Sequence, residues 1–220
     1  LYMLRERGGD YAIFVVVGSG LTGLWSSLLF VSGGALNQER WSGTLESLVG
    51  MPTSLEVVVF GKNLAYVTQS LGSMVLAYAL ASLLFGTPLH VAQPLLFLAS
   101  IILTTVSFVC LGLLLAPMFV ANPDIRNFVN ALEYPMYILA GFLFPIALLP
   151  GWTTPLSYVL APYWAAEALH AASTGTAALN NMALDWGMLL VLGAAYVLIG
   201  RWLFRVFLRK ARQDATLDFF

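Results

Sequence analysis

Charged residues are scarce in this sequence. Only 10% of its 220 residues are charged, whereas 60% are hydrophobic. An ordinary soluble domain is about a quarter charged and about half apolar, so a water-soluble fold of this size could not cover so much apolar surface. The apolar residues also form runs of roughly 20 residues, the length that crosses a bilayer. The composition therefore predicts an integral membrane protein.

The sequence also has few of the groups from which catalytic and metal sites are built. It contains one cysteine, Cys110, inside an apolar run, and two histidines, His90 and His170. A disulfide within the chain and a cysteine-based metal site are therefore excluded. The hydrolase motifs Gly-x-Ser-x-Gly and His-Glu-x-x-His do not occur, and a net charge of −1 gives no basic field for nucleic acid. We expect no catalytic residue, no metal site and no nucleic-acid partner.

Five apolar stretches are long enough to cross a bilayer. They cover about residues 11–34, 55–85, 95–120, 131–149 and 186–207. A shorter stretch, 155–172, is interrupted by Pro162, and we interpret it as a re-entrant or outer pair of half-helices. The predicted fold class is an all-α polytopic helical bundle, with one transmembrane domain over residues 1–220.

The basic residues predict the orientation of the chain, because short loops rich in Lys and Arg stay in the cytoplasm. Residues 86–94 and 150–185 contain neither type, whereas five basic residues crowd the stretch 201–212. We therefore place the C-terminus in the cytoplasm and residues 1–10 outside. An outside N-terminus without a signal sequence leads us to expect a further span before Leu1, giving six in the native subunit.

A polar segment of about residues 37–49 connects the first two apolar stretches. On a helical wheel Trp41, Leu45 and Leu48 form an apolar stripe, and the polar residues lie largely elsewhere. The segment is either a helix that lies on the membrane surface and faces a protein, or a plain interfacial loop. Its amphipathicity alone does not distinguish the two.

The residues of this segment resemble the cytoplasmic signature of ABC-2 permeases. That signature has an acidic–basic pair, then Gly-Thr-Leu-Glu, then a Pro-Thr/Val-Ser turn into the next span. The matching residues here are Glu39, Arg40, Gly43, Thr44, Leu45, Glu46, Leu48, Pro52 and Ser54. The resemblance continues in residues 139–145 with Leu149-Pro150, and in residues 161–169, where Ala161 replaces the family's usual Asn.

The resemblance implies the transmembrane subunit of an ATP-driven exporter in a bacterial or archaeal plasma (inner) membrane. Segment 37–49 would be a coupling helix that docks on a separate nucleotide-binding ATPase subunit. Its contact residues would be Glu39, Arg40, Gly43, Thr44, Leu45 and Glu46. The sequence has no Gly-x-x-x-x-Gly-Lys-Ser/Thr phosphate loop, so ATP and Mg²⁺ would bind in the partner. The expected complex also contains a second permease subunit, either identical or related. Membrane lipids and an amphiphilic or lipid-linked substrate would be its other partners.

Two other classes of protein are alternatives. An ATP-independent channel or secondary transporter should show paired broken helices or several charges within the membrane. A membrane-embedded enzyme needs a convergent nucleophile and base. The cytoplasmic signature argues against the first alternative, and the missing motifs argue against the second.

Small residues cluster in the first apolar stretch. Residues 18–23 match the dinucleotide fingerprint Gly-x-Gly-x-x-Gly, but no βαβ pattern surrounds them. Small side chains let transmembrane helices approach closely, so helix packing is the favoured interpretation, and the same seam could line the substrate path. The residues assigned to it are Gly18, Ser19, Gly20, Thr22 and Gly23.

Two groups of polar residues complete the candidate sites. Asn127, Asn130, Glu133 and Tyr137 recur at helical spacing on one face of the fourth stretch. This face has either a role in transport or a position at the level of the lipid headgroups. Pro162, Glu167 and His170 mark the outer segment. Glu167 and His170 are spaced for an i,i+3 pair, which is either a proton relay or part of a solvated rim.

Overall fold

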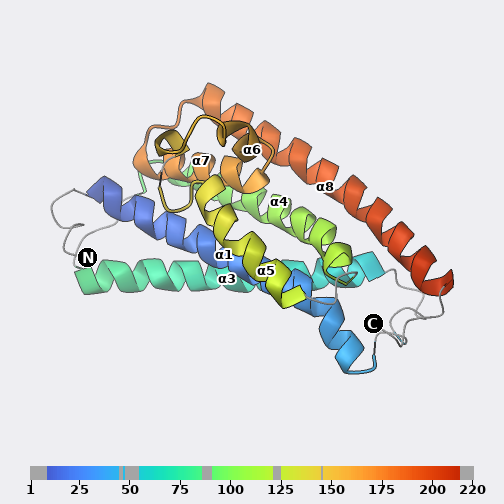
Figure 1. Cartoon of the computed structure of the whole chain (residues 1–220). Coiled ribbons are helices and arrows are strands. Elements are labelled where there is room, and N and C mark those ends of the chain that lie inside the picture. The colour runs from blue at the N-terminus through green and yellow to red at the C-terminus, as the bar shows by residue number, and fades with distance from the viewer. Residues whose placement is uncertain are drawn as a thin grey trace.

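The computed structural model describes residues 9–44, 47, 55–85, 91–120, 125–144 and 146–213. The described residues form helices and turns, without a strand, as the composition predicts. The helices, drawn in Figure 1, are α1 (Gly9–Trp41), α3 (Leu55–Phe85), α4 (Pro94–Val120), α5 (Ile125–Leu139), η2 (Ile146–Leu148), α6 (Thr154–Tyr158), α7 (Ala161–Thr174) and α8 (Leu179–Gln213).

Three of the described helices are long and apolar enough to cross a membrane. Their apolar windows are Ile13–Phe30 in α1, Pro94–Met118 in α4 and Leu179–Val206 in α8. With 33 and 35 residues, α1 and α8 are about 50 Å long, whereas the hydrocarbon core is about 30 Å thick. Helix α1 continues from Phe30 to Trp41 beyond its apolar window, and α8 continues from Val206 to Gln213.

The structure corrects two of the expected boundaries. The expected span 131–149 is helical only to Leu139, because the chain turns at Gly141, whose φ of 71° lies in the left-handed region. The 15 residues of α5 measure about 22 Å, less than the hydrocarbon thickness. Residues 37–41, expected to start a separate surface helix, are instead the last turn of α1.

The outer segment consists of two helices, α6 and α7. They meet at Val159 and Leu160, so the break comes just before Pro162. Pro162 lies in the first turn of α7, where a missing backbone N–H leaves no helical hydrogen bond unmade. At the other end, Gly175 closes α7 with a φ of 80°, and its amide donates to the carbonyl of Ala171.

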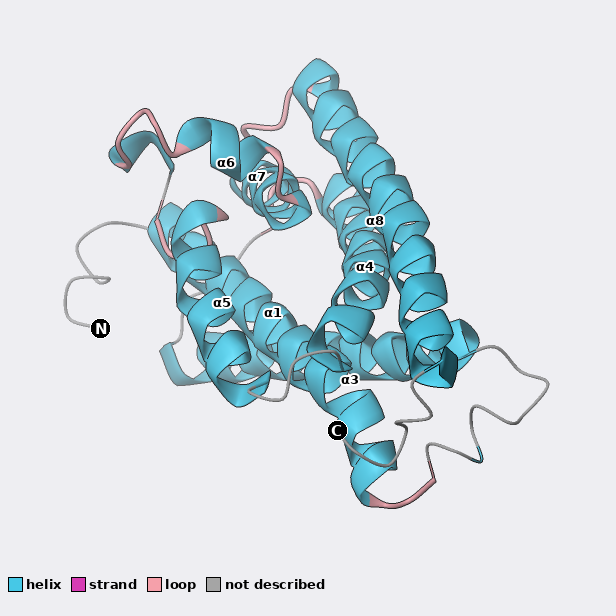
Figure 2. Ribbon diagram, turned by 45° about the vertical axis from the view of Figure 1, so that its right-hand side comes forward, coloured by secondary structure: helices cyan, strands magenta, loops and turns pink. Residues whose placement is uncertain are grey.

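Helices α1 and α4 form the centre of the bundle. Helix α4 packs against α1, α3, α7 and α8, and α1 packs against α3, α4, α5 and α7. Figure 2 shows α4 and α8 side by side. The core between α1 and α4 is fully buried, and Trp25 meets Phe108 edge to face with ring centroids 6.5 Å apart.

Small residues allow close approach at several of these contacts, as expected where helices associate in lipid. A methyl group at Gly18 would overlap the backbone carbonyl of Phe142, in the turn after α5. One at Gly112 of α4 would overlap the side chain of Asn63, which is buried in α3. One at Gly200 of α8 would come within 3.0 Å of the carbonyl oxygen of Leu113 in α4.

The predicted Gly18–Gly23 seam divides between different neighbours. Gly18 faces the turn after α5, whereas a methyl group at Gly20 would lie 2.6 Å from the sulfur of Met74 in α3. Gly23 is exposed, and a methyl group there would meet nothing within 4 Å. The hydroxyls of Ser19 and Thr22 donate to backbone carbonyls of α1 itself, those of Val16 and Ser19. These residues therefore do not form one contact face within the chain.

We predict that Gly18→Ala destabilises the protein, whereas Gly23→Ala does not. The new methyl group at residue 18 meets backbone that cannot rotate away, and overpacking of this kind costs about 1–3 kcal/mol. Alanine favours a helix over glycine by about 1 kcal/mol. This gain offsets part of the overpacking cost at residue 18, and at residue 23 it is the only expected change in stability. Thermal midpoints of both variants in detergent test this, and equal midpoints would contradict the close approach at Gly18.

Candidate functional site

The signature residues Glu39 and Thr44 lie where α1 ends. From Phe30, the end of the apolar window, α1 continues for about 16 Å to Trp41. Gly43 then turns the chain with a φ of 67°. The amide of Thr44 donates to the carbonyl of Glu39 at 2.9 Å, and the Thr44 hydroxyl donates to the carbonyl and the carboxylate of the same residue. The signature thus closes the C-terminal end of α1.

Glu39 also connects α1 to α3. Lys62 of α3 donates from Nζ to Glu39 Oε1 at 2.6 Å, and both side chains are partly buried. The hydrogen bonds from Lys62 and Thr44 hold the pKa of Glu39 below its ordinary value of 4.5. The stability that this ion pair provides is therefore present above pH 4.5 and is lost only as the pH falls through the lower pKa of the folded state.

The other coupling candidates are only partly visible. Gly43 and Thr44 are exposed. The side chain of Arg40 and the residues Leu45 and Glu46 lie outside the described residues. No sequence signal pairs Glu39 with Lys62, because the two residues are 23 positions apart on different helices.

The structure brings two residues of the predicted polar face together with a serine of α1. Ser26 Oγ donates to Glu133 Oε1 at 2.8 Å, and Tyr137 Oη donates to the same oxygen at 2.6 Å. Ser26 Oγ and Tyr137 Oη are 2.5 Å apart. The side chains of Asn127 and Asn130 lie outside the described residues.

Ser26 lies in the apolar window of α1, four residues before its end at Phe30, so this polar cluster of Ser26, Glu133 and Tyr137 lies beside that window. An ionisable side chain there is costly unless it faces the protein interior and has partners. Glu133 meets both conditions through two hydroxyls, one from each helix. The cluster therefore joins α1 to α5. The sequence pattern identified Glu133 and Tyr137, but it did not identify Ser26, which is one small polar residue among several in the span.

Glu167 and His170, which the sequence analysis places in an outer segment, line a cavity between α1, the turn after α5, α6 and α7. Its volume is about 650 Å³. The His170 ring stacks on Phe14 of α1, with centroids 3.9 Å apart and an interplanar angle of 17°. Within the described part of the chain neither ring nitrogen of His170 has a hydrogen-bond partner, so the i,i+3 pair with Glu167 is not formed. Pro162 is buried in the first turn of α7.

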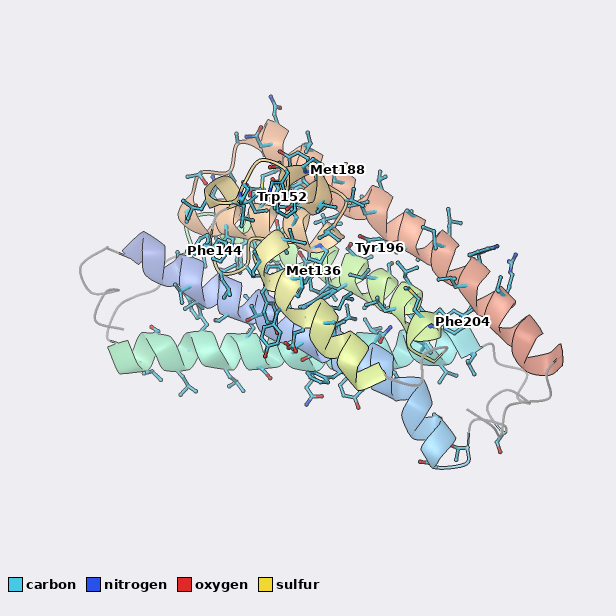
Figure 3. All side chains as sticks on the ribbon, viewed as in Figure 1. Met136, Phe144, Trp152, Met188, Tyr196 and Phe204 are labelled. Carbon is cyan, nitrogen blue, oxygen red and sulfur yellow. The ribbon has the colours of Figure 1, made fainter. Side chains whose placement is uncertain are left out.

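Tyr196 of α8 fixes the break between α6 and α7. Its side chain, labelled in Figure 3, is buried, and its hydroxyl accepts from the amide of Ala161 at 3.1 Å and donates to the carbonyl of Val159 at 3.3 Å. The backbone groups freed by the break are therefore covered by protein. Among the described residues no group of three His, Cys, Asp or Glu side chains is arranged to hold a metal ion.

Long apolar helices, an interior carboxylate with its own partners and a protein-covered helix break together define a polytopic helical membrane protein. A family model described as "ABC-2 type transporter" matches residues 14–174, which is more than half of the chain. The chain therefore belongs to the ABC-2 type transporter family, and the resemblance seen in the sequence is confirmed. It is a permease component of a transporter. A search of curated proteins finds no match.

We predict that Tyr137→Phe weakens the bundle, whereas Tyr134→Phe leaves it unchanged. The first substitution removes the hydroxyl from Glu133 and Ser26 but keeps the ring. Hydrogen bonds between transmembrane helices contribute about 0.6 kcal/mol on average and up to about 1.7 kcal/mol, so we expect a loss in this range. Tyr134 is 67% exposed and serves as the matched control. Unfolding in detergent measures both variants, and equal stabilities would mean that the polar cluster does not hold α1 to α5.

Proposed function

We propose that this chain is the transmembrane permease subunit of an ATP-driven exporter that moves an amphiphilic or lipid-linked substrate. Separate ATPase subunits would bind ATP and Mg²⁺, since the sequence has no phosphate loop. A second permease subunit would complete the pathway. Membership of the ABC-2 type transporter family supports transport as the activity.

The observation that carries this proposal is the ion pair at the end of α1. The signature begins at Glu39, about 14 Å beyond Phe30, where the apolar window ends, which puts it within reach of a soluble partner. Glu39 is bonded to Lys62, so a force on the segment would move α1 and α3 together. A partner that holds this segment differently in two nucleotide states would thereby act on two helices at once.

Helix α1 offers a continuous route from that segment to the outer side. Near its middle, Ser26 is bonded to Glu133 and Tyr137 of α5. Nearer its start, Gly18 packs against the backbone of Phe142, and Phe14 stacks on His170 of α7. A displacement of α1 along its axis would therefore be felt at the polar cluster and at the outer cavity. In this proposal Glu39 and Thr44 position the segment, while Arg40 and Glu46 are left to contact the ATPase.

We predict that Glu39→Lys uncouples the transporter and that Glu39→Lys with Lys62→Glu restores coupling. The single change places two cations together, and the double change rebuilds the pair with its charges exchanged. Because both side chains remain partly exposed, we expect a stability change of at most about 1 kcal/mol. The ATP turnover of the reconstituted complex should fall at least tenfold in the Glu39→Lys variant. Co-purification of a phosphate-loop ATPase and ATP turnover of the reconstituted complex are the measurements.

The control for this experiment is Glu56→Lys, which breaks the more exposed pair between Glu56 and Arg201 elsewhere on α3. Its activity should stay close to that of the unmodified protein. If the double exchange remains as inactive as the single change, Glu39 contacts the ATPase directly and does not act through Lys62. If no phosphate-loop ATPase co-purifies and none of the variants changes activity, the segment is an ordinary loop and the proposed coupling is wrong.

A further inference from the structure

The cavity on the outer side has the size and the walls of a small-molecule site. Its volume of about 650 Å³ lies within the range of about 300–1,000 Å³ that is typical of ligand pockets. Four parts of the chain form it: Phe14 of α1, the turn from Ala140 to Gly141, the stretch from Ile146 to Gly151, and α6 and α7 with Thr176 just after them. Phe144 and Trp152, labelled in Figure 3, belong to the connection from α5 to α6.

Among the described residues, the charged group that lines the cavity and the one that lies next to it are acidic. Glu167 lines it, and Asp185 of α8 lies close enough to interact electrostatically with Glu167. Residues 127–200 contain neither Lys nor Arg. A phosphate or carboxylate group would therefore find no cationic partner on this stretch, whereas a cation would meet one carboxylate directly and a second one nearby.

The remaining polar groups suit a hydrogen-bond donor with an apolar body. Helix α7 lies outside the three candidate spans, and burial lowers the pKa of His170 to about 4, so the ring is neutral at physiological pH. A neutral imidazole has one acceptor nitrogen, and within the described residues neither nitrogen of His170 is bonded. Tyr158 and Tyr163, with ring centroids 5.3 Å apart, add aromatic faces that attract cations.

Other ligand classes fit less well. The described residues contain no group of three side chains able to hold a metal ion, so a bare metal ion lacks ligands. Isoleucine, leucine and alanine side chains cover much of the remaining wall, which suits hydrocarbon. We propose that this cavity binds an organic ammonium ion, the amine-bearing end of an amphiphile, with Glu167 as the counter-ion and His170 as a hydrogen-bond acceptor.

Binding at this cavity requires neither ATP nor a partner chain, whereas a role for the ligand as the exported substrate rests on the proposed function. The test therefore uses the full chain alone in nanodiscs of zwitterionic lipid. The probe is dansylcadaverine, a fluorescent primary amine, and its N-acetyl derivative is the matched neutral probe. Fluorescence titration, corrected for empty nanodiscs, should show saturable binding of the amine and at least tenfold weaker binding of the acetylated probe.

Two substitutions locate the probe. Glu167→Gln keeps the shape of the side chain but removes its charge, and it should weaken amine binding about tenfold, to the level of the acetylated probe. Gly151→Phe places a ring at a lining position where a methyl group would meet nothing within 4 Å, and it should weaken binding of both probes. Glu56→Gln removes a carboxylate far from the cavity, on α3, and should leave both affinities unchanged.

Several results would overturn the ammonium site. Equal affinity of the unmodified protein for the two probes would exclude it, and this comparison needs no variant to fold. Retention of the amine preference by a monodisperse Glu167→Gln variant would exclude Glu167 as the counter-ion. If a neutral alkyl glucoside displaces the amine and binds with an affinity similar to that of the amine, the cavity is a site for hydroxylated headgroups instead. None of these results bears on ATPase association, so failure here is distinct from failure of the proposed coupling.

Discussion

The need to satisfy every backbone polar group without water governs this structure. Where water is excluded, only helices meet that need along a single segment, so each buried break between helices must be covered by other parts of the protein. Tyr196 does this between α6 and α7 through the amide of Ala161 and the carbonyl of Val159. The carbonyls of Ala172 and Ser173 at the end of α7 accept from the amides of Gln93 and Ala92, just before α4. The outer helices are thereby fixed to α4 and α8, and the cavity beside them has a defined shape.

Contact between helices in lipid depends on close packing, because lipid chains are as apolar as the side chains that face them. Glycines allow helices to approach closely at several points, such as Gly112 against Asn63 and Gly200 against Leu113. Polar contacts add to them at particular points, as where Trp186 Nε1 of α8 donates to Ser100 Oγ of α4 at 2.9 Å. The contacts of Gly200 and Trp186 join α8 to α4, whereas Gly112 brings α4 close to α3.

Helix α1 connects the features that bear on transport. Its C-terminal end carries Glu39, its middle carries Ser26, and its first turns carry Phe14 and Gly18. Each of these residues contacts a different element, namely α3, α5, α7 and the turn after α5. One continuous helix therefore joins the signature segment to the cavity lined by His170.

The sequence by itself determined the helical membrane class, the family and several of the candidate residues, because hydrophobic run length and the Glu39–Ser54 signature are local properties. The sequence also predicted a helix break near Pro162, because a proline in a short apolar stretch is likewise a local property. It did not reveal that α5 ends at Leu139, since the turn at Gly141 continues an apolar run without any change in composition. Contacts such as Glu39 with Lys62, Ser26 with Glu133 and Phe14 with His170 join distant positions. Only the packing of whole helices sets which side chains meet, so the tertiary structure alone decided the ion pair, the polar cluster and the cavity.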